Sequence, residues 1–146
     1  MKSIFKILAI LISLLICSPA FSQSSTDALS ACMVDNLNGK ERKSLAKWIF
    51  FAMGAHPEIK SYMKATPKDV QASDEYVGTL ITRLLTVDCS AHLKIAYTSD
   101  PESLQKAFEV IGKVAMQELM TSNEVNKAIA EYARFADTAK IDKVLK

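Results

Sequence analysis

Residues 38–54 read NGKERKSLAKWIFFAMG and predict a helix of unusual composition. Asn38, followed three residues later by Glu41, forms a capping-box pattern, which marks a helix start. Gly54 marks the end of the same helix. The first half of the helix is amphipathic, whereas its second half, WIFFAM, is apolar on all sides. A helix without a polar face is normally buried, so one interpretation is a helix in the core.

The same stretch supports a second interpretation, in which its aromatic residues contact a partner protein. Phe50 and Phe51 lie on the side of the helical wheel that also carries Lys43 and Lys47. Large exposed aromatic residues usually mark an interface. Both interpretations stay open from the sequence, and the second makes Lys43, Lys47, Phe50 and Phe51 candidate partner-binding residues.

Outward from this stretch, the chain after residue 22 has the pattern of an all-α protein. Apolar residues recur at three- and four-residue spacings, and the alternating pattern of strands is absent. We expect one compact domain of about five to seven helices over residues 23–146. Gly78 and Gly112 fall inside predicted helices, where each costs about 1 kcal/mol relative to alanine. We expect close helix–helix approach to explain both glycines.

The first 22 residues have the pattern of a cleaved signal peptide. Lys2 and Lys6 form a basic end, an apolar run follows, and Ala20 and Ser22 bracket a small-residue cleavage site. We therefore expect a periplasmic or secreted protein, cleaved after Ser22, with no stable membrane span. Lipidation of Cys17 is not expected, because a large isoleucine precedes it where a lipobox has a small residue.

Beyond the leader, the only cysteines are Cys32 and Cys89. Two cysteines in an oxidising compartment usually pair, so we expect one intramolecular disulfide. Such a bond closes a loop of about 58 residues and stabilises the fold by roughly 4 kcal/mol in the chain-entropy model.

The charge balance and the missing motifs narrow the function. Removal of Lys2 and Lys6 with the leader leaves as many basic as acidic residues (16). A neutral domain lacks the clustered positive charge that nucleic-acid binding requires. Two isolated histidines, His56 and His92, predict no metal site, and we expect no cofactor. No catalytic motif is present, so we do not expect an enzyme.

Two charged residues lie on apolar helix faces. Arg42 falls between apolar positions of its helix, and Glu118 does the same in a later helix. A buried charge needs a partner, so we hypothesise that Arg42 and Glu118 form a partly buried ion pair. The alternative is that each side chain lies near a helix end and reaches water.

In outline, a short exported helical domain with one cysteine pair is similar to two kinds of bacterial envelope protein. One kind comprises the immunity proteins that block cell-wall amidase toxins, and the other comprises small acid-stress chaperones. The leading expectation is a protein that binds another protein, as an immunity or inhibitor protein does. The alternatives are an acid or envelope stress chaperone, a cell-wall enzyme, or a small-ligand carrier with a cavity near Trp48.

An apolar stripe of Ala107, Val110 and Val114 fits either a central helix or the seam of a homodimer.

Overall fold

The structure is a computed structural model that describes residues 23–146. The predicted leader, its cleavage after Ser22 and the question of Cys17 lie outside the described residues. Within residues 23–146 the regular structure is entirely helical, which confirms the predicted all-α class. There are eight α-helices in this part of the chain, more than the predicted five to seven. They are α2 (Ser25–Asp35), α3 (Gly39–Met53), α4 (Pro57–Lys60), α5 (Pro67–Arg83), α6 (Ser90–Ser99), α7 (Ser103–Met120), α8 (Asn123–Ala130) and α9 (Thr138–Leu145).

Local capping explains where several helices begin. The Asn38 side chain accepts a hydrogen bond from the Glu41 N–H at 3.0 Å, and the Glu41 carboxylate accepts one from the Asn38 N–H at 2.9 Å. Thr66 and Asp69 form the same reciprocal box at the start of α5. These contacts satisfy backbone N–H groups that a helix leaves free at its first turn.

In the sequence, Ser73 is followed by two acidic residues, a pattern that suggests the start of a new helix. In the structure, α5 continues through Ser73 without a break. Ser73 is buried, with 4% exposure, because it lies on the face that packs inward. The helix then changes to a π-helical turn, Leu84–Asp88, in which the Cys89 N–H donates to the Leu84 carbonyl at 2.8 Å. This turn places Cys89 beside Cys32. The two cysteines form the predicted disulfide, with Cα atoms 5.9 Å apart.

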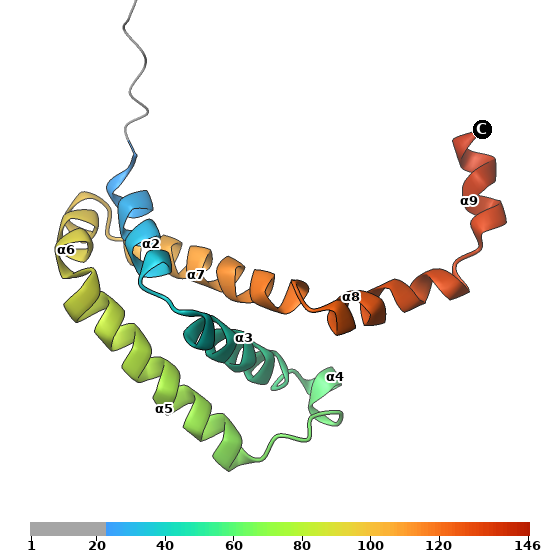
Figure 1. Cartoon of the computed structure of the whole chain (residues 1–146), viewed down its shortest axis with the longest axis horizontal. Coiled ribbons are helices and arrows are strands. Elements are labelled where there is room, and N and C mark those ends of the chain that lie inside the picture. The colour runs from blue at the N-terminus through green and yellow to red at the C-terminus, as the bar shows by residue number, and fades with distance from the viewer. Residues whose placement is uncertain (1–22) are drawn as a thin grey trace, which may run out of the picture.

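The core gathers around α7, which packs against α2, α3 and α6. Its inward face carries four buried residues at four-residue spacing, Ser103, Ala107, Ile111 and Ala115. The small alanines let the partner helices approach closely. In Figure 1, α5 and α7 diverge from the end of the molecule that holds α6, and α3 lies between them, in contact with both. Two sides of α3 therefore face other helices.

Beyond α7 the chain leaves the body of the molecule. The α8 helix, a short 3-10 turn (Glu131–Phe135) and α9 form an arm that extends away from the other helices in Figure 1. No residue of these three elements is buried. The expectation of a compact domain over residues 23–146 therefore applies to α2–α7 and is wrong for the arm.

Candidate functional site

The second half of α3 lines two hollows in the surface. One, the aromatic groove, has a volume of about 670 Å³. The other, the apolar pocket, has a volume of about 360 Å³ and lies between α3, α5 and α7. Lys47, Phe50 and Phe51 line the groove, whereas Trp48 and Ile49 line the pocket. Residues of the apolar run WIFFAM therefore line both the groove and the pocket, which explains why this run has no polar face.

The aromatic groove brings together three of the four residues predicted as a partner-binding surface. Lys47, Phe50 and Phe51 come from α3, and they meet residues from the loop after α4 and from the first turns of α5. Lys43 does not join them, because it points into a separate hollow beside the junction of α7 and α8. The remaining lining residues of the aromatic groove are Tyr62, Met63, Lys64, Ala65, Asp69 and Ala72.

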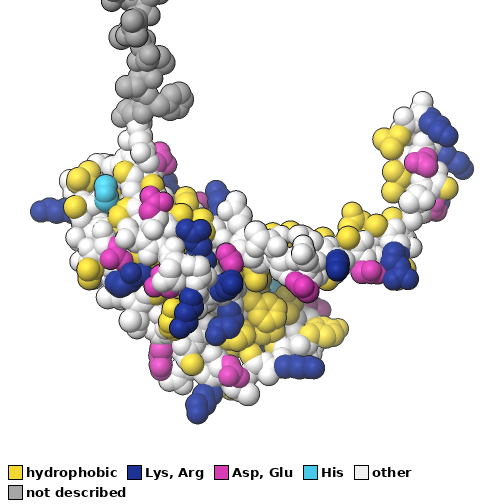
Figure 2. Space-filling model, in the orientation of Figure 1, with side chains coloured by type: hydrophobic (Ala, Val, Ile, Leu, Met, Phe, Trp, Pro, Cys, Tyr) yellow, Lys and Arg dark blue, Asp and Glu magenta, His cyan; other side chains and the backbone are white. Residues whose placement is uncertain are grey.

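Exposure distinguishes the two interpretations of the phenylalanines. Phe50 is 49% exposed, so it lies at the surface, and the core interpretation is wrong for this residue. Phe51 is half-buried, and its ring centroid lies 6.1 Å from that of Phe50. Tyr62, at 82% exposure, extends the apolar surface. Figure 2 shows hydrophobic side chains gathered where α3 ends and α4 begins, with lysine and arginine side chains beside them.

Close packing at the end of α3 holds the groove together. A Cβ atom on Gly54 would lie 2.5 Å from the sulfur of Met63, so the Met63 side chain packs directly against the Gly54 backbone and would have to shift for any larger residue at position 54. His56 caps the short α4 helix, since its Nδ1 atom accepts a hydrogen bond from the Glu58 N–H at 3.2 Å. Gly54, His56 and Met63 thus fix the wall that faces Phe50.

The groove contains charges of both signs. Lys47 and Lys64 supply two cations, and Asp69 supplies an anion. The hydroxyl and the backbone N–H of Thr66 donate to the Asp69 carboxylate at 2.6 and 2.9 Å, and they hold its pKa below its ordinary value. Lys47 lowers that pKa further. Asp69 is therefore ionised at neutral pH, and the lysines leave the groove with one net positive charge.

The predicted ion pair between Arg42 and Glu118 is not formed. The Arg42 guanidinium instead donates to the Val34 carbonyl at 3.3 Å. Glu118 lines the hollow beside the α7–α8 junction, together with Lys43. The two side chains point to different places because Arg42, in the first turn of α3, lies against the end of α2.

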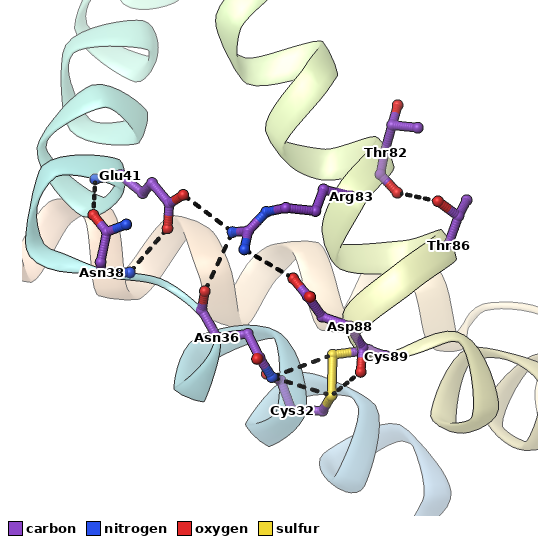
Figure 3. A network of polar contacts seen from close by, with 9 residues as sticks. All are labelled: Cys32, Asn36, Asn38, Glu41, Thr82, Arg83, Thr86, Asp88 and Cys89. Carbon is purple, nitrogen blue, oxygen red and sulfur yellow. Dashed lines mark hydrogen bonds and ion pairs between the residues drawn. A yellow bond between two sulfur atoms is a disulfide. The ribbon is translucent and has the colours of Figure 1, made fainter.

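The arginine that does join partly buried carboxylates is Arg83, which the sequence analysis did not single out. Its guanidinium lies 3.1 Å from Glu41 and 3.1 Å from Asp88, and it donates to the Asn36 carbonyl at 3.3 Å (Figure 3). These contacts join the start of α3, the π-helical turn and the end of α2 beside the disulfide. The sequence feature that could have pointed to Arg83 is the end of α2, which has no basic residue in its last turn. Arginines from other helices supply cations to its terminal carbonyl groups.

Two features are absent from residues 23–146. None of the helices there is both long and apolar enough to cross a membrane. Within that range, histidine, cysteine, aspartate and glutamate residues do not gather in groups of three that could hold a metal ion.

The chain was also compared with known proteins. It matches no protein-family model, no curated protein and no solved structure.

Proposed function

We propose that this chain is an exported binding protein whose aromatic groove holds an apolar segment of another protein. The observation that carries the proposal is the exposure of Phe50 and Tyr62 on either side of one groove. Surfaces that leave large aromatic residues exposed in one cluster are typical of protein interfaces. The pairing of Cys32 with Cys89 is compatible with an oxidising compartment outside the cytoplasm.

The charges indicate the chemistry of the partner segment. Lys47 and Lys64 line the groove, and Asp69 is the one acidic side chain among its lining residues. An acidic side chain beside an aromatic or aliphatic one would complement this arrangement. The Thr66–Asp69 capping box and the packing of Met63 against Gly54 hold the walls of the groove in place, and a preformed surface loses little entropy on binding. An inhibitor or immunity protein that blocks one enzyme would use such a surface.

The proposal is tested by selecting a random peptide library, displayed on phage, against the mature chain. Selected peptides should combine acidic with apolar residues and should lose at least tenfold in affinity against Phe50→Ser. Tyr62→Ser should act in the same direction. The matched control is Tyr97→Ser, because Tyr97 is 57% exposed but lies on α6, outside the groove.

Two outcomes would contradict the proposal. One is a selection that yields no binding peptide. The other is a set of peptides whose affinity Phe50→Ser leaves as it was, or that Tyr97→Ser weakens equally. Circular dichroism of each variant shows whether its helices are intact before affinities are compared.

A further inference from the structure

The apolar pocket has the form of a small-molecule site and is separate from the aromatic groove. Its floor is α3, and its two walls are α5 and α7. Its volume of about 360 Å³ falls within the range of pockets that hold small ligands. Nine of its ten lining residues are apolar or glycine. They are Leu45, Trp48, Ile49, Val77, Gly78, Ile81, Phe108, Ile111 and Gly112; Asp74 completes the lining.

The glycines in the walls are not explained by helix packing. A Cβ atom built on Gly78 or on Gly112 would have no neighbour within 4 Å. The expectation of close helix–helix approach at these two positions is therefore wrong. Glycine lowers the stability of a helix interior, so its presence in both walls calls for another reason. The missing side chains leave the space that the pocket occupies.

The polar part of the pocket is an acceptor with no free donor beside it. The indole N–H of Trp48 donates to Oδ1 of Asp74 at 2.8 Å, which occupies the one donor that tryptophan has. Among the described residues, no hydrogen bond reaches the other oxygen, Oδ2 of Asp74. An incoming molecule therefore meets an apolar surface and one carboxylate oxygen. Such a site accepts a hydrogen bond from a cation and repels an anion.

We propose that the apolar pocket binds a small amine with an apolar body, whose ammonium group donates to Asp74. The apolar body fills the space beside Gly78 and Gly112 and lies against the indole of Trp48. The proposal goes beyond the proposed function, because none of these four residues lines the aromatic groove.

The test uses three probes with one apolar body and different head groups: 4-phenylbutylamine, 4-phenylbutanol and 4-phenylbutyrate. Trp48 is the single tryptophan of the chain, so its fluorescence reports binding directly. The amine should shift this fluorescence with a dissociation constant about tenfold below that of the butyrate, and the alcohol should fall between them. Asp74→Asn keeps an oxygen for the indole N–H and should reduce the difference between amine and butyrate to less than threefold.

A second variant distinguishes this pocket from other apolar surfaces. Gly112→Leu places a side chain in the open space and should weaken amine binding at least tenfold, without harm to the helix. The matched control is Gly39→Ala, which also meets no neighbour but lies at the start of α3, outside the pocket. The proposal is overturned if the amine does not bind, if the three probes bind equally, or if Gly112→Leu leaves binding unchanged. Binding of selected peptides to the aromatic groove should be the same in all these variants.

Discussion

At the scale of single residues, Arg83 shows why the sequence does not reveal the partners of a charged side chain. Two of its three partners are far away in sequence, since Asn36 and Glu41 precede it by more than forty residues. Helical periodicity places a residue on a face, but it does not say which other helix meets that face. Arg42 was identified as a charge on an apolar face, and the assignment of Glu118 as its partner was wrong for this reason.

Replacement of Arg83 by glutamine should lower the free energy of unfolding by about 1–2 kcal/mol. The physical reason is that the side chains of Glu41 and Asp88, which are 14% and 17% exposed, would lose their cation. Urea unfolding followed by circular dichroism measures the change.

The matched control for this variant is Arg134→Gln, which removes an exposed ion pair with Glu131. Exposed pairs contribute little, so its effect should stay within about 0.5 kcal/mol. Equal losses in the two variants would show that the contacts of Arg83 add nothing beyond a surface charge.

At the scale of elements, the start of α3 was predictable from the sequence, and the surroundings of the helices were not. Asn38 and Glu41 form their predicted capping box because capping depends on residues only three apart. The apolar end of α3 suggested burial, yet Phe50 is half exposed and Trp48 faces a hollow. Composition shows that a helix is apolar on all sides. It cannot show whether each side faces the core, a groove or a pocket.

The glycines of these elements give a prediction with opposite signs for one chemical change. Gly112→Ala should raise the free energy of unfolding by about 0.5–1 kcal/mol, because the added methyl meets no neighbour and alanine favours the helix. Gly54→Ala should lower it by about 1 kcal/mol, because the methyl would overlap Met63. Thermal and urea unfolding of the two variants measure both effects, and a common sign would contradict the packing described at either site.

At the scale of the whole molecule, the all-α class and the disulfide followed from the sequence, and the shape did not. Cys32 and Cys89 were the only cysteines beyond the predicted leader, so their pairing needed no geometry. The arm was not foreseen, because α8 and α9 are amphipathic and their apolar faces suggest packing against a core. In the structure those faces remain exposed, with Phe135 at 87% and Val144 at 86%.

Because the arm buries no residue, removing it should leave the stability of the body almost unchanged. A chain that ends at Ser122 should have a free energy of unfolding in urea within about 1 kcal/mol of that of the full chain. The dependence of this free energy on urea concentration should also be similar, because the arm buries little surface that unfolding would expose. Ile111→Ala provides the scale, because this residue is buried at 3% exposure and its truncation should cost about 2–4 kcal/mol. A loss as large as that of Ile111→Ala would mean that the arm packs on the body in solution and covers part of its surface.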